Sequence, residues 1–107
     1  MRITVTARHC DVTPDLRTRA RDLVERLAKV AARPHDGRVI FSDNHGVAAA
    51  ELRLHTVRGA VLVGRAEGVD HRTALDRAAA RVRRQLDKSP AKRSGPARRR
   101  AMSREAE

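Results

Sequence analysis

Four short stretches of the chain have the patterning of β-strands. In the first, apolar Ile3 and Val5 alternate with threonines, which predicts a strand with one face buried. In the third, Leu52 and Leu54 fall on the side opposite Arg53. The four predicted strands cover residues 2–7, 39–42, 50–57 and 60–67.

Two longer stretches have the 3.6-residue period of helices with one apolar face. The first begins after Thr13, whose hydroxyl is a good N-cap, with Pro14 at the first helical position and Asp15 in the first turn. Its apolar residues fall within an arc of about 120° when successive residues are set about 100° apart. The segment 33–37 contains proline and glycine and is expected to end this helix.

The second helix is predicted to run from about His71 to Asp87. Asp70 stands at its cap position, and Ser89-Pro90 stops it. Its inward positions are the apolar residues Ala74, Leu75, Ala78, Ala79, Val82 and Leu86.

The order of elements is therefore β-α-β-β-β-α, and the predicted fold class is α+β. Asp43–Gly46 closes the second strand, and Arg58-Gly59 indicates a tight hairpin between the last two. Two helices with one apolar face each suit one face of a four-stranded sheet. The opposite face should then carry Thr4, Thr6, Arg53 and Arg65 toward solvent.

With 107 residues, the chain is long enough for one domain, expected at residues 1–90. Residues 91–107 mix basic residues with serine, proline, glycine and alanine without periodicity. They are expected to form a disordered basic tail.

The net charge of +11 says nothing about the fold, but it indicates the kind of partner: nucleic acid or an anionic surface. Residues 88–107 contribute +5 and residues 1–87 the remaining +6, so the charge is not confined to the tail. Phe41 is the one aromatic residue. Proteins that read single strands usually stack bases on exposed rings, so phosphate contacts and shape recognition are the modes left open.

The remaining composition argues against several other classes. The single Cys10 excludes a disulfide framework and fits a reducing cytoplasm. The chain begins directly with a strand pattern and has no apolar run of bilayer length, so a cytoplasmic protein without membrane contact is expected. The five histidines lack ligand-like spacing, and no catalytic motif is present. We therefore expect neither metal, cofactor nor enzymatic activity, although turnover through His55 or His71 is a third alternative.

The strongest candidate binding feature is a row of cations along the second helix. Arg77, Arg81, Arg84 and Lys88 fall within an arc of roughly 60° and extend over about 16 Å of helix. Such a row is able to meet several phosphates. The competing interpretation is an ordinary solvated helix face.

The first helix and the tail offer weaker candidates. Arg19, Arg26, Lys29 and Arg33 follow one flank of the first helix, interrupted by Asp22, and would border the same groove as the row if the helices pack side by side. The pairs Asp22–Arg26 and Glu25–Lys29 would equally well stabilise the helix itself. In the tail, Lys92, Arg93 and the arginines at 98–100 form either a mobile clamp for polyanions or a solubilising extension.

Two segments of the chain resemble the ribosome hibernation factor family, which includes ribosome-associated inhibitor, protein Y and the short hibernation-promoting factor. The first is Met1–Arg8, followed by Val12-Thr13 and Leu16-Arg17. The more specific one contains Ala66-Glu67-Gly68, Asp70, Ala74, Asp76, Arg84-Gln85-Leu86 and Lys88. The resemblance covers roughly residues 1–92.

The resemblance implies a fold similar to the double-stranded-RNA-binding domain, with two parallel helices on the sheet. It implies binding to 16S ribosomal RNA in the decoding channel of the 30S subunit, in competition with mRNA, tRNA and initiation factors, during stress or stationary phase. The implied RNA-binding residues are Arg77, Arg81, Arg83, Arg84, Lys88 and Lys92, with Arg26 and Lys29 on the first helix. Arg33 and Arg93 extend this set on the basis of charge.

The chain also departs from the family pattern. His71-Arg72-Thr73 stands where the family commonly has an aromatic residue, and Val30–Ala32 replaces an aromatic pair. The sequence lacks the dimerising domain of the family's long form, so it is not expected to pair ribosomes by itself, and a monomer off the ribosome is expected. A general module for structured RNA or DNA is the alternative function.

Overall fold

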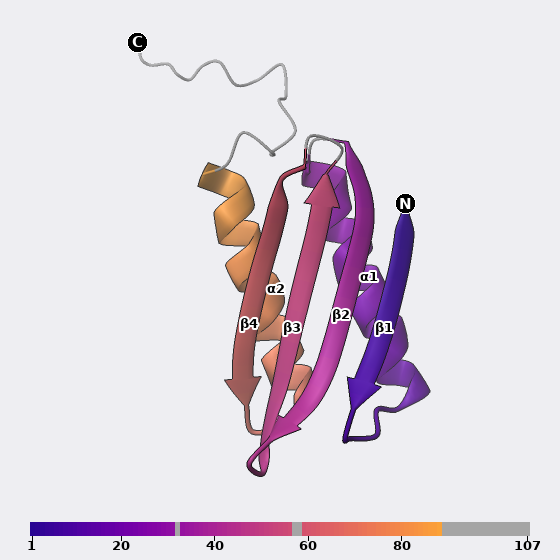
Figure 1. The fold of residues 1–107 in the computed structure, drawn as a ribbon, viewed down its shortest axis with the longest axis vertical. Coiled ribbons are helices and arrows are strands. Elements are labelled where there is room, and N and C mark those ends of the chain that lie inside the picture. The colour runs from indigo at the N-terminus through magenta and orange to yellow at the C-terminus, as the bar shows by residue number, and fades with distance from the viewer. Residues whose placement is uncertain (32, 57–58, 89–107) are drawn as a thin grey trace.

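The computed structural model describes residues 1–31, 33–56 and 59–88. Its elements follow the predicted order β-α-β-β-β-α (Figure 1). They are β1 (Arg2–Arg8), α1 (Pro14–Val30), β2 (Pro34–Asn44), β3 (Val47–Thr56), β4 (Val61–Gly68) and α2 (His71–Lys88). The tail from residue 89 onward, for which disorder was expected, lies outside the described residues.

The four strands form one sheet in the order β1-β2-β3-β4. β1 is parallel to β2, and the other two pairings are antiparallel. Both helices lie on one face, with α1 over β1 and β2 and α2 over β3 and β4, while the face toward the viewer in Figure 1 is uncovered. The helices follow strands of the same direction, β1 and β4, so they run parallel to each other. The predicted fold class is therefore confirmed.

The core lies between the helices and the sheet. Its largest fully buried side chains are Phe41, Leu52, Leu54, Leu75, Leu86, Val24, Val39 and Val82. α2 approaches the sheet closely at Gly64, where an added Cβ would collide with the carbonyl oxygen of Ala78 and come within 2.9 Å of a methyl group of Val82. A glycine on β4 thus sets how closely the cationic helix packs.

The second strand is longer than the sequence predicts. It begins at Pro34 instead of Val39, so the expectation that residues 33–37 form only a helix-ending loop is wrong. Arg2 pairs with Asp36 and Thr4 with Arg38 across the parallel ladder, and this pairing recruits residues without strand patterning of their own. The strand interrupts its register once, between Pro34 and Asp36.

The turn between β2 and β3 is tighter than predicted. His45 and Gly46 both have positive φ angles, 55° and 83°, as a two-residue hairpin turn requires. Because the turn needs two residues, β3 begins at Val47 instead of Ala50. β3 and β4 pair antiparallel, as a hairpin requires. The turn predicted at Arg58-Gly59 falls partly on residues 57–58, which lie outside the described part of the chain.

Candidate nucleic-acid interface

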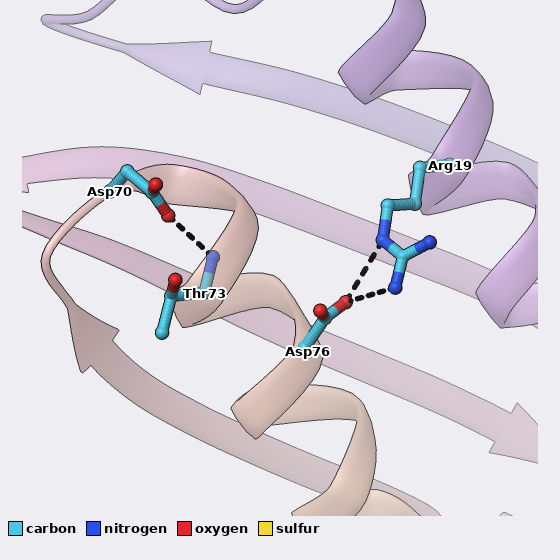
Figure 2. Close-up of polar contacts among 4 residues, drawn as sticks. All are labelled: Arg19, Asp70, Thr73 and Asp76. Atoms are coloured by element: carbon cyan, nitrogen blue, oxygen red, sulfur yellow. Dashed lines mark hydrogen bonds and ion pairs between the residues drawn. The ribbon is translucent and has the colours of Figure 1, made fainter.

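The N-terminus of α2 is fixed by Asp70, as the sequence predicts. The Thr73 N–H donates to the Asp70 carboxylate at 2.7 Å (Figure 2). The Ala74 N–H donates to the Asp70 carbonyl at 3.1 Å. The hydrogen bonds from Thr73 lower the pKa of this exposed carboxyl group, since they favour its charged form. The helix that carries the cationic row is therefore capped at the end away from Lys88.

One ion pair joins the two helices. The Arg19 guanidinium lies 2.8 Å from the Asp76 carboxylate and donates a second hydrogen bond of 3.0 Å from Nε (Figure 2). Both contacts end on the same carboxylate oxygen, Oδ1 of Asp76. Arg19 is thereby neutralised and is removed from the set of free cations that the sequence suggested on α1.

Arg77, Arg81 and Gln85 lean from α2 over the free edge of the sheet. Arg77 donates to the Glu67 carbonyl at 2.9 Å, and Arg81 donates to the Arg65 carbonyl at 2.6 Å. Gln85 continues this ladder one turn further by accepting from the Val63 N–H and donating to the Val63 carbonyl. The helical spacing of four residues matches alternate outward-facing peptides of β4, so each side chain finds one.

At the opposite edge of the sheet, side chains of α1 donate to backbone carbonyl groups of β1 in the same way. Arg17 donates to the Val5 carbonyl at 3.2 Å and Arg21 to the Ile3 carbonyl at 3.4 Å. Unpaired strand edges otherwise invite pairing with another chain, and charged side chains are a common protection. Four arginines of the helices thus have a structural role, which the competing interpretation of a merely solvated face did not include.

The edge contacts do not remove Arg77 and Arg81 from the candidate interface. Each guanidinium has five N–H donors, and both side chains remain exposed. Their contacts with carbonyl groups neutralise no charge, and they hold the guanidinium groups in place before any ligand arrives. The cost in side-chain entropy of ordering them at a phosphate is correspondingly smaller.

Arg84 and Lys88 complete the row without a structural role of this kind. Both side chains are exposed, and neither forms a hydrogen bond or ion pair with any residue that the structure describes. Together with Arg81 and Gln85 they line an open hollow of about 410 Å³ at the C-terminal end of α2. These two residues are the freest cations of the row.

The other predicted residue of α2, Arg83, lies on the flank that faces α1. Arg83 follows Asp76 by seven residues, and Arg26 follows Arg19 by the same interval, so both occupy the inter-helix side. Arg83 pairs with Asp87 at 3.5 Å. The row from Arg77 to Lys88 lies over β4 instead, and the expectation that both helices' cations border one groove with that row is therefore wrong.

On α1, Arg26 and Lys29 are exposed, as is Arg33 beyond its end. Across residues 1–31, 33–56 and 59–88, no ion pair joins Asp22 to Arg26 or Glu25 to Lys29, so the pairs considered from the sequence do not form. These three cations form no ion pair within the described ranges and remain available to a ligand. Lys92 and Arg93 lie beyond the described residues.

Sequence reasoning missed two arginines on the uncovered face of the sheet. It placed Arg53 and Arg65 there, which the structure confirms, but it did not assign Arg8 and Arg38 to that face. The signal was present for Arg8, which continues the alternation of β1 by one residue. For Arg38 it was lost because the strand was predicted to begin one residue later.

The histidines do not form a site with the other titratable residues. His71 Nε2 lies 2.8 Å from the Ser42 carbonyl, and its ring packs edge-on against Phe41 with ring centres 5.9 Å apart. The histidine thus supplies a ring contact at the position where the resemblance leads one to expect an aromatic residue. Within the described ranges, no group of three histidine, cysteine or acidic residues is placed to hold a metal ion. None of the helices described is long and apolar enough to cross a membrane.

The chain can now be compared with known proteins. Residues 3–94 match the family described as sigma 54 modulation protein / S30EA ribosomal protein. No curated protein matches the sequence.

Two solved structures have a similar fold. One is a ribosomal subunit interface protein from Coxiella burnetii (TM-score 0.66, 23% identity, 82% of this chain and 96% of the other covered). The other is the N-terminal domain of Protein Y from Thermus thermophilus (TM-score 0.70, 23% identity, 82% and 98% covered).

The fold and the exposed cations define a small basic α+β module with two parallel helices on a four-stranded sheet. Because the family match extends over most of the chain, this module belongs to the sigma 54 modulation / S30EA family, the ribosome hibernation factors. It is a ribosome-associated protein, and the resemblance noted in its sequence is confirmed.

Proposed function

We propose that this protein is a translation inhibitor of the cytoplasm that binds 16S rRNA in the mRNA and tRNA channel of the 30S subunit during stress or stationary phase. The observation that carries the proposal is the row Arg77, Arg81, Arg84 and Lys88, exposed on a family-matched module. Arginine and lysine at this spacing suit successive phosphates of an RNA backbone.

The proposed mechanism requires no chemical step. Phosphate contacts release condensed counterions, which supplies affinity, and the volume of the module then excludes mRNA, tRNA and initiation factors. The Asp70 cap and the Arg19–Asp76 ion pair support this mechanism because the first fixes the N-terminus of α2 and the second fixes α2 relative to α1. A rigid module loses little entropy on docking.

Co-sedimentation with purified 30S subunits across a salt series tests this function. We expect Arg84→Glu/Lys88→Glu to weaken binding by tenfold or more and to lower the slope of log affinity against log salt by about 2. This pair is a cleaner test than Arg77 or Arg81, whose loss also uncovers β4.

Arg72→Glu is the matched control on the same helix, and its 30S affinity is compared with that of the single variant Arg84→Glu. Arg72 is exposed near the N-terminus of α2 and lies outside the row, so its reversal should change binding little. Failure of the wild type to co-sediment even at low salt would contradict the proposal. The alternative, a general module for structured RNA, predicts that mRNA and tRNA do not displace the protein from 30S.

A further inference from the structure

The uncovered face of the sheet has a hollow lined by arginines from all four strands. The hollow has a volume of about 220 Å³, roughly that of seven water molecules in the liquid, which accommodates a phosphodiester group. This face is turned toward the viewer in Figure 1, on the side of the sheet away from both helices. Its lining arginines are Arg8 (β1), Arg38 (β2), Arg53 (β3) and Arg65 (β4).

Most of this charge is uncompensated inside the molecule. The guanidinium groups of Arg8, Arg38 and Arg65 form no hydrogen bond or ion pair with any residue in the described ranges. Arg53 pairs with Glu51, whose side chain is 18% exposed and is the one carboxylate in the lining. The lining therefore has four positive charges and one negative charge.

The sheet register sets two of these arginines against each other, while Glu51 stands opposite Arg65. Arg38 stands directly opposite Arg53 on the neighbouring strand, and neighbouring strands are about 4.8 Å apart. Like charges directly opposite each other destabilise a sheet. A bound anion would offset this repulsion, and guanidinium groups bind phosphate oxygens in a paired, planar geometry.

The rest of the lining favours a phosphate over a base. Its other members are Ile40, Ser42, Ala49 and Ala50, so no aromatic ring is available for stacking. The single phenylalanine of the chain points to the opposite side and is fully buried in the core. A backbone phosphodiester therefore suits the hollow better than an unstacked nucleotide does.

We infer that Arg8, Arg38, Arg53 and Arg65 form a second RNA-backbone site, so that the module binds two separate RNA segments, one on each side. The inference rests on the proposed function for the row on α2. The row belongs to the helix layer and the hollow to the opposite face of the sheet, and the edge of β4 lies between them, where Arg81 donates to the Arg65 carbonyl. A module with this distribution of charge suits a cleft with RNA on two sides.

The full-length protein and a short labelled RNA hairpin provide the direct test, with stoichiometry read by analytical ultracentrifugation at low salt. We expect the wild type to bind two hairpins and Arg38→Glu/Arg65→Glu to bind one. Arg84→Glu/Lys88→Glu changes the net charge equally on the other surface, so it should also bind one. We call Arg38→Glu/Arg65→Glu the open-face variant, and its binding of two hairpins would overturn the inference.

Binding to 30S subunits gives the second readout. The open-face variant should bind at least tenfold more weakly near 0.1 M salt, with the salt slope lower by about 2. Unchanged 30S affinity and slope in this variant would overturn the inference and leave the proposed function standing. If the wild type binds two hairpins but no 30S subunit, the proposed function fails and the second site stands.

Two further experiments distinguish RNA phosphate from free phosphate as the ligand, and loss of binding from loss of stability. Inorganic phosphate at millimolar concentration should not displace the second hairpin; equal displacement by phosphate would overturn the assignment to RNA. Arg38→Gln should keep or raise the thermal midpoint while weakening RNA binding, because it removes the repulsion with Arg53. A lowered midpoint with unchanged binding would make Arg38 a structural residue and contradict the inference.

Discussion

Arginine has three different roles in this small protein, and individual contacts distinguish them. Arg19 is neutralised by Asp76, Arg77 and Arg81 hold strand carbonyl groups while keeping their charge, and Arg84 is unpaired within the described residues. Charge counted along the sequence does not separate these cases. A residue with an internal partner contributes to the fold first, and one without a partner is better suited to a ligand.

At the residue scale, the Asp70 cap predicts a pH dependence of stability. Its pKa is lowered in the folded state from an ordinary value of 3.8, so its contribution is present above that value and is lost as pH falls through the folded-state pKa. Thermal unfolding of Asp70→Ala should therefore show a lower midpoint than the wild type at neutral pH. The difference should shrink as the pH falls below 3.8. Asp70→Asn, which keeps an N-cap oxygen, is the control and should recover part of the neutral-pH loss.

At the element scale, α1 and α2 protect the two free edges of the sheet with side chains four residues apart. Arg17 and Arg21 do so for β1, and Arg77, Arg81 and Gln85 do so for β4. The helices therefore bury the apolar face of the sheet and also satisfy part of its outer backbone. This dual role explains why polar side chains flank the apolar arc of each helix.

The edge contacts predict a change in association. Arg77→Met/Arg81→Met should leave β4 open to pairing with a second copy and raise the self-association measured by sedimentation velocity. Each lost hydrogen bond should also cost about 0.5–1.5 kcal/mol of unfolding free energy at most, since solvent replaces part of it. Arg84→Met/Lys88→Met removes the same charge from the same helix without uncovering the strand. Equal association of both variants would contradict the role of the edge contacts.

At the scale of the whole molecule, the exposed cations of the described residues are divided between two sides of a two-layer module. The row over β4 and the cations beside Arg83 belong to the helix layer, whereas the arginine hollow belongs to the open face. The close approach at Gly64 holds α2 against the sheet, and the Arg19–Asp76 ion pair ties α1 to α2. The two surfaces therefore move as one body.

This division predicts independent contributions to ribosome binding. If each surface contacts its own RNA segment, combining Arg38→Glu/Arg65→Glu with Arg84→Glu/Lys88→Glu should lower log affinity for 30S by the sum of the separate effects, within about 0.5 kcal/mol. Co-sedimentation of the four-residue variant measures this at a salt concentration where the pairs still bind. A combined effect no larger than that of one pair would indicate a single shared RNA segment.

The sequence by itself determined the order of elements, the core faces, the Asp70 cap and the positions of cations along α2. These features depend on neighbours within a few residues, where periodicity and capping chemistry are decisive. It did not determine the start of β2, because Pro34–Arg38 becomes a strand only through pairing with β1 and β3.

Only the tertiary structure decided which cations are free. The partner of Arg19 is 57 residues away, and the carbonyl groups that hold Arg77 and Arg81 belong to another element. The arginine hollow likewise draws one arginine from each of four strands; alternation along a strand sets the face of each, but only the pairing of the strands brings the four together. Charge is a property of composition, but its compensation depends on contacts between distant segments, and these exist only once the chain has folded.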